Sequence, residues 1–191
     1  MKKLKKLNNI LIFVFSLISI CIGVYYINTG KIDRLGACFT IPLVFMLPKI
    51  ANKLFKVDIS VDLEFTYILF VIAAQFFGSV IYLYNSIWWY DLLCHFVSGI
   101  LTSVLALNIL SFFDIKSKKK TFNYIFIICF TISIAAIWEY LECLIDFLFK
   151  TNVQHYIETG TKDTITDMIA GTIGSILFSI YNYNKNKKIA K

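Results

Sequence analysis

Seven ionisable side chains lie in or beside the long apolar runs of this 191-residue sequence. Ionisable groups are costly in lipid hydrocarbon and rare there, so they mark functional sites. Residues three or four positions apart share one face of a helix, and the spacing therefore predicts three polar helix faces. These faces carry Asp91 and His95 at i and i+4, Glu139, Glu142 and Asp146 at i, i+3 and i+7, and Asp163 and Asp167 at i and i+4.

The chemistry of this set suits a divalent cation. Its six carboxylates cannot all be ionised side by side in a low dielectric, so some hold a proton or a cation neutralises them. Carboxylates with one imidazole suit Zn, Mn or Mg. If the site is catalytic, we expect His95 or Glu142 to act as the base. The predicted metal ligands are Asp91, His95, Glu139, Glu142, Asp163 and Asp167, and Asp146 completes the predicted binding site.

Composition identifies the elements that must position these residues. The chain is 58% hydrophobic and only 16% charged, whereas soluble domains are about a quarter charged. A run of about 20 apolar residues is long enough to cross a bilayer as a helix. We therefore expect one all-α integral membrane domain over 1–191, a polytopic bundle with six transmembrane helices at 7–27, 35–50, 65–84, 92–113, 124–149 and 164–183.

The distribution of basic residues predicts the topology. With both termini cytoplasmic, most of the 19 Lys and Arg lie on the inner side of six spans, as the positive-inside rule requires. The segment 35–50 is short and carries both prolines. If it did not cross the membrane, one set of basic segments would lie on the outer side. This topology predicts a bacterial plasma (inner) membrane protein whose polar helix faces all lie towards the outside. Membrane lipid is the expected partner, and no basic patch interleaved with aromatics indicates nucleic acid.

Three segments then resemble a known family. Tyr90–Gly99 reads YDLLCHFVSG and resembles the Y-D-x-x-x-H-F-x-x-G motif of YjdF-type proteins, which are uncharacterised bacterial inner-membrane proteins. The segment Trp138–Glu142 is similar to that family's acidic helix, and Gly160–Met168 resembles its G-T and D-T-x-x-D-M segments. The resemblance covers 88–183, the motif-bearing half. It supports the same site residues and implies no particular reaction.

A looser similarity is to VanZ-like proteins, which carry a D-x-x-x-H helix and a final D-x-x-x-N-x-x-G helix. Ala170 and Gly171 stand where that asparagine would be expected. The association of VanZ-like proteins with glycopeptide resistance is therefore not transferred to this chain.

Three functions remain open at this point. We expect a multi-pass membrane protein whose outward-facing Asp/Glu/His site binds a cation or an envelope headgroup. The alternative is a metal-assisted hydrolase or transferase on lipid or lipid-linked envelope substrates, although no H-E-x-x-H or G-x-S-x-G motif occurs. The second alternative is a proton- or cation-coupled transporter, whose relay should continue inward. The inner halves of the last three spans offer only Ser, Thr and Asn108.

Overall fold

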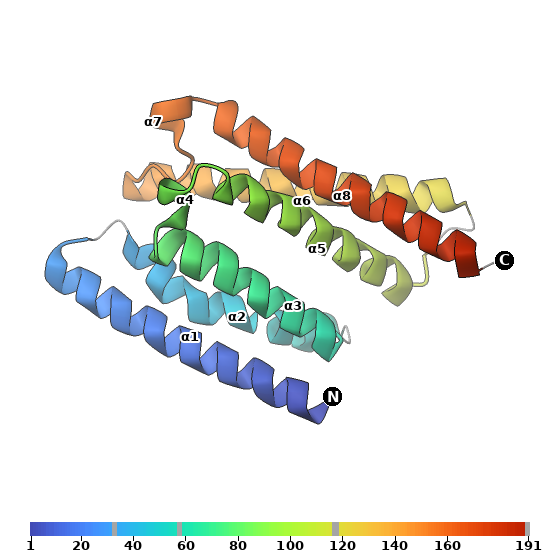
Figure 1. Ribbon diagram of the computed structural model, residues 1–191, viewed down its shortest axis with the longest axis horizontal. Helices are drawn as coiled ribbons and strands as arrows, with labels where there is room; N and C mark the ends of the chain where they lie inside the picture. The colour runs from blue at the N-terminus through green and yellow to red at the C-terminus, as the bar shows by residue number, and fades with distance from the viewer. Residues whose placement is uncertain (32–33, 57–58, 116–118, 190–191) are drawn as a thin grey trace. The chain divides into compact units, whose positions relative to one another are not determined.

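The computed structural model describes residues 1–31, 34–56, 59–115 and 119–189, and all regular structure in these ranges is helical (Figure 1). The chain divides into two compact units, Met1–Asp91 and Leu92–Lys191. The elements are α1 (Lys2–Thr29), α2 (Leu35–Phe55), α3 (Val61–Val71), the π-helical continuation η2 (Ile72–Val80), α4 (Leu83–Ser86), α5 (Tyr90–Phe112), α6 (Lys120–Phe149), α7 (Tyr156–Thr159) and α8 (Lys162–Ile189).

Six of the described helices are long and apolar enough to cross a membrane, with α3 and η2 counted together as Val61–Val80. The predicted all-α bundle with six spans is confirmed. Large apolar side chains remain exposed along these helices; Phe13 is 68% exposed and Phe147 is 70% exposed. Such continuous apolar surface is expected where lipid covers a helix. Lys116, Lys118 and Lys191, which entered the predicted topology, lie outside the described residues.

The third span differs from the predicted range 65–84. The helix begins at Val61, because the Ser60 hydroxyl caps it by accepting a hydrogen bond from the backbone N–H of Leu63 at 3.3 Å. The span ends at Val80, and Tyr82 then takes a left-handed φ of 75° that helical backbone does not allow. The apolar residues that follow Val80 therefore belong to a turn and to the short helix α4.

The first unit packs α1, α2 and the α3–η2 span around an apolar core. Ile41, Phe45 and Ile68 are fully buried in this core. The Tyr26 hydroxyl donates to the carbonyl oxygen of Val80 at 3.0 Å, where the π-helical stretch ends. None of the seven predicted site residues except Asp91 belongs to this unit.

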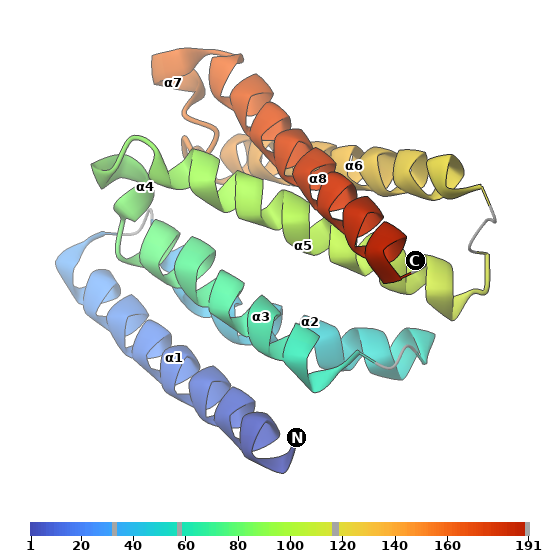
Figure 2. The same ribbon diagram turned by 45° about the vertical axis from the view of Figure 1, so that its right-hand side comes forward.

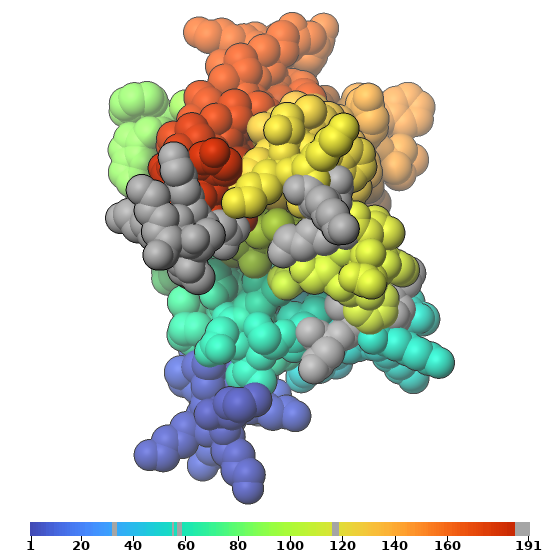
Figure 3. All heavy atoms as spheres, turned by 90° about the vertical axis from the view of Figure 1, so that its right-hand side faces the viewer, coloured from blue at the N-terminus to red at the C-terminus, as the bar shows by residue number. Residues whose placement is uncertain are grey.

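In the second unit α5, α6 and α8 lie side by side (Figures 1 and 2). At the end of the unit that contains the chain terminus, α8 lies beside the start of α6 (Figure 3), and the rings of Tyr124 and Tyr183 meet with centroids 5.9 Å apart. Two glycines bring α5 and α8 together: a Cβ on Gly99 would clash with the backbone of Gly171, and one on Gly174 with the carbonyl oxygen of Phe96. Small residues permit such backbone approach between membrane helices.

Candidate functional site

Three of the predicted residues meet where α5 and α8 begin. Asp91, His95 and Asp167 each offer a ligand atom, and these atoms lie within 4.8 Å of one another. His95 Nε2 is 3.9 Å from Asp167 Oδ2, and the two side chains are 11% and 5% exposed. Although the division between the two units follows Asp91, the continuous helix α5 carries both Asp91 and His95. Their i, i+4 separation therefore fixes them on one helix face.

The contact between α5 and α8 at Gly99 and Gly171, called the glycine crossing below, positions this cluster. Gly99 follows His95 by four residues on α5, and Gly171 follows Asp167 by four residues on α8. The two glycines are in backbone contact one helical turn from the ionisable pair. The imidazole and the carboxylate therefore face each other because the helix backbones are held close together.

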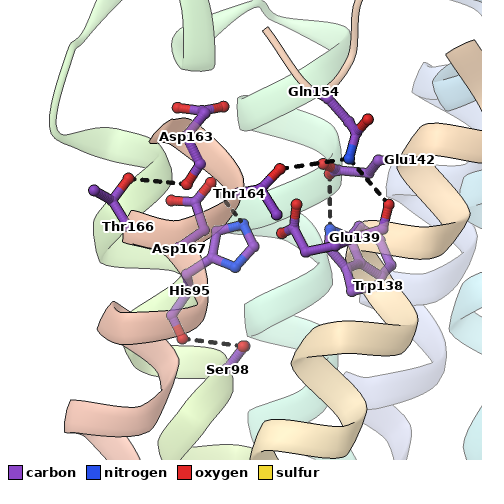
Figure 4. Close-up of polar contacts among 10 residues, drawn as sticks. All are labelled: His95, Ser98, Trp138, Glu139, Glu142, Gln154, Asp163, Thr164, Thr166 and Asp167. Carbon is purple, nitrogen blue, oxygen red and sulfur yellow. Dashed lines mark hydrogen bonds and ion pairs between the residues drawn. The ribbon is translucent and has the colours of Figure 1, made fainter. Parts of the chain in front are cut away.

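Glu139 of α6 adds a third carboxylate next to the cluster. The residue is 4% exposed, and its Oε1 has no hydrogen-bond partner among the described residues. Figure 4 shows its carboxylate turned towards His95 and Thr164. A buried polar oxygen without a partner is costly and requires an explanation. A ligand between Glu139 and the other three side chains would supply that partner.

A loop after α6 is fastened beside Glu139. The Asp146 carboxylate accepts hydrogen bonds from Thr151 Oγ1 at 2.7 Å and from the backbone N–H groups of Val153 and Gln154 at 2.7 and 3.0 Å. Gln154 Nε2 in turn donates to the carbonyl oxygen of Glu139 at 3.2 Å. Asp146, predicted as a binding residue, therefore anchors this loop with its carboxylate.

Two other predicted residues lie outside the three-residue cluster. Glu142 is half-buried, and its Oε1 accepts a hydrogen bond from Trp138 Nε1 at 2.8 Å. Asp163 is also half-buried, and its carboxylate points away from His95 in Figure 4. Of the seven predicted residues the structure thus brings together Asp91, His95 and Asp167, and it turns the Glu139 carboxylate towards His95.

Sequence reasoning missed Thr164 and Gln154. Thr164 Oγ1 lies 3.5 Å from Gln154 Nε2, and its side chain points towards Glu139 in Figure 4. Thr164 precedes Asp167 by three residues, so helical spacing could have found it. Gln154 lies in a loop without periodicity, and no local pattern could have placed it next to Glu139.

A cluster of hydroxyls fills the bundle beyond the glycine crossing. The Ser103 and Ser175 hydroxyls are 2.8 Å apart, and Thr131 Oγ1 lies 3.3 Å from Ser103 Oγ and 3.2 Å from Thr102 Oγ1. Ser103 and Ser175 are fully buried. Hydrogen bonds of this kind join membrane helices without ionising, so this cluster is sufficiently explained by helix packing.

The fold and the cluster define a class: a multi-pass α-helical membrane protein with a candidate site of carboxylates and one imidazole where α5 and α8 begin. The family model described as "Predicted membrane protein (DUF2238)" matches residues 7–188, so the chain belongs to this family. This family is the YjdF family, so the resemblance seen in the sequence is confirmed. The resemblance covered only 88–183, whereas the family model matches nearly the whole chain. The searches of curated proteins and of solved structures found no match.

Proposed function

We propose that this protein binds a divalent cation through Asp91, His95 and Asp167. The observation that supports this proposal is the convergence of one imidazole nitrogen and two carboxylate oxygens within 4.8 Å of one another. Three protein ligands leave a fourth position open, an arrangement typical of sites at which water or substrate also binds. A structural site would instead be closed by a fourth protein ligand.

The separation between His95 and Asp167 agrees with two ligands of one ion. The distance of 3.9 Å is too long for a hydrogen bond. Two ligands of a tetrahedral ion with bonds of 2.0–2.2 Å are roughly 3.4 Å apart. A shift of about half an ångström therefore brings both atoms to the separation of two ligands of one ion. Nitrogen with carboxylate oxygen favours Zn²⁺ or Mn²⁺, and Mg²⁺ is the harder alternative.

Charge supports the same proposal. Asp91 and Asp167 both lie close to His95, towards which the Glu139 carboxylate is turned, and Asp167 and Glu139 are almost fully buried (Figure 4). Carboxylates held together in low dielectric repel one another. A divalent cation neutralises that charge, and a ligand of the ion can also donate to Glu139 Oε1, which has no hydrogen-bond partner among the described residues.

We further propose that the site faces the outside of a bacterial plasma membrane. Within the second unit the basic residues Lys119, Lys120 and Lys185 lie at the ends of helices opposite to the site. The sequence adds Lys187 and Lys188 at that end. Since basic residues collect on the cytoplasmic side, the site end is the outer one and the carboxyl terminus is cytoplasmic. An even number of six spans then puts the amino terminus on the same side.

Metal analysis of the purified protein tests the cation site. After loading with Zn²⁺ or Mn²⁺ and removal of excess metal, we expect about one ion per chain in the wild type. His95→Ala and Asp167→Asn should lower the affinity by at least about 100-fold, since even the loss of an outer-shell partner costs 10–100-fold. The matched control is Glu158→Gln, because Glu158 is exposed and pairs with Asn152 at 2.6 Å. Stoichiometric metal in all three variants would contradict the proposal.

A further inference from the structure

Glu139 is buried, and its Oε1 has no hydrogen-bond partner among the described residues. Its carboxylate is turned towards His95 from a different helix (Figure 4). It is not one of the three residues whose ligand atoms lie within 4.8 Å of one another. A carboxylate that lies next to a metal site without belonging to the ligand set can accept a hydrogen bond from a water bound to the ion. It is then placed to take the proton of that water.

The other predicted bases are less suitable for this step. The imidazole of His95 is used as a ligand in the proposed site. Glu142 Oε1 accepts the hydrogen bond of Trp138 Nε1 at 2.8 Å, outside the cluster. Glu139 therefore takes the role of base that the sequence suggested for His95 or Glu142.

The depth of the site indicates the substrate. His95 is the sixth residue of α5 and Asp167 the sixth residue of α8, so each lies roughly 7.5 Å along the axis from its helix N-terminus at 1.5 Å per residue. Each headgroup region is about 5–7 Å thick. With the two helix N-termini at its outer surface, the cluster lies close to the border between headgroups and hydrocarbon. The phosphate esters of membrane lipids lie at this level. The N-termini of two helices also favour an anionic phosphate there.

We propose that Glu139 is the general base of a metal-assisted hydrolase that cleaves a phosphoester of membrane phospholipid; this inference rests on the proposed cation site. Glu139 takes a proton from the water bound to the ion, and the resulting hydroxide attacks phosphorus. The new O–P bond forms as the P–O bond to the lipid alcohol or headgroup breaks. The leaving oxygen receives the proton from Glu139, so water and phosphodiester give an alcohol and a phosphomonoester.

Metal content and turnover, measured on the same samples, test this inference. Wild type, Glu139→Gln and Glu158→Gln are reconstituted with Zn²⁺ or Mn²⁺ in vesicles of phosphatidylethanolamine, phosphatidylglycerol and cardiolipin. Phosphorus NMR and mass spectrometry then follow the phosphomonoester and the released alcohol. We expect wild type and Glu158→Gln to form product at equal rates. Glu139→Gln should keep its metal and lose at least about 100-fold in rate, since general base catalysis contributes 10²–10⁴-fold.

The remaining outcomes separate the two proposals. Loss of metal in Glu139→Gln would make Glu139 a ligand and overturn its role as base. In that case Glu139→Asp, which keeps the carboxylate, should bind metal again. If Glu139→Gln had lost its metal by misfolding, the carboxylate of Glu139→Asp would not restore binding. A metal-loaded wild type that forms no product would overturn the hydrolase and leave the cation site standing. A wild type that binds neither metal would overturn the proposed function itself.

Discussion

Gly99 of α5 lies against the backbone of Gly171 of α8 so closely that a Cβ on Gly99 would clash with the Gly171 carbonyl oxygen. Each glycine follows a proposed ligand by four residues, His95 on α5 and Asp167 on α8. The contact between two residues without side chains therefore sets the separation of two residues with functional side chains. Packing of α5 against α8 and the geometry of the proposed cation site therefore depend on the same contact.

Gly99→Ala should force α5 and α8 apart, because the obstacle is a backbone carbonyl that cannot rotate away. We expect a loss of about 1–3 kcal/mol in unfolding free energy, the usual cost of overpacking, together with weaker cation binding. Thermal unfolding in detergent and metal titration measure the two effects. Gly36→Ala is the matched control, since its Cβ would meet nothing within 4 Å. Equal effects of both substitutions would refute the role given to the glycine contact.

The hydroxyl cluster should stabilise the helix pair without affecting the site. Ser103→Ala and Ser175→Ala each remove one partner of a buried pair 2.8 Å apart. We expect a coupling energy of about 0.6–2 kcal/mol in a double-mutant cycle on unfolding, as found for hydrogen bonds between membrane helices. Cation affinity should stay unchanged. Ser133→Ala is the control, because Ser133 is exposed and its hydroxyl donates to the backbone carbonyl oxygen of Cys129 in its own helix.

Asp146→Ala should release the loop that is fastened beside Glu139. Its carboxylate accepts three hydrogen bonds from the loop, including the backbone N–H groups of Val153 and Gln154. Hydrogen bonds to a charged group contribute about 1.5–3 kcal/mol each, so these two amides should exchange with deuterium at least about 10-fold faster. Unchanged protection of both amides would show that the loop is held by other contacts.

The proposed topology predicts opposite labelling of two asparagines in the second unit. In a background without the five native cysteines, Asn152→Cys should react with a membrane-impermeant thiol reagent added to intact cells. Asn184→Cys, at the other end of the helices, should react only after the cells are opened. The reverse pattern would place the site on the cytoplasmic side, against the positive-inside rule.

The sequence allowed part of this site to be predicted, and the limits have physical causes. Asp91, His95 and Asp167 follow from helical spacing, because an i, i+4 pair shares a face in any straight helix. The same rule could not distinguish Glu139 from Asp146, since both occupy one face of α6. Only the loop after α6 distinguishes them, because its backbone N–H groups donate to the Asp146 carboxylate. That loop carries no periodic signal.

The span boundaries show a similar limit. The apolar run continues past Val80, whereas the helix ends there, because Tyr82 takes a left-handed backbone conformation. At the other end, the predicted span began only at Phe65, because Asp62 and Glu64 interrupt the apolar run, although both lie in the first turn of α3. Hydropathy reports the affinity of a segment for lipid and does not report where its backbone leaves the helix.

X-ray absorption spectroscopy of the zinc-loaded wild type tests the central claim most directly, because it reads the ligands of the ion. We expect nitrogen and oxygen ligands at about 2.0–2.2 Å from the ion, together with the more distant scattering of one imidazole ring. His95→Ala should lose that imidazole scattering. Sulfur at about 2.3 Å from any of the five cysteines, or an imidazole pattern that persists in His95→Ala, would contradict the site formed by Asp91, His95 and Asp167.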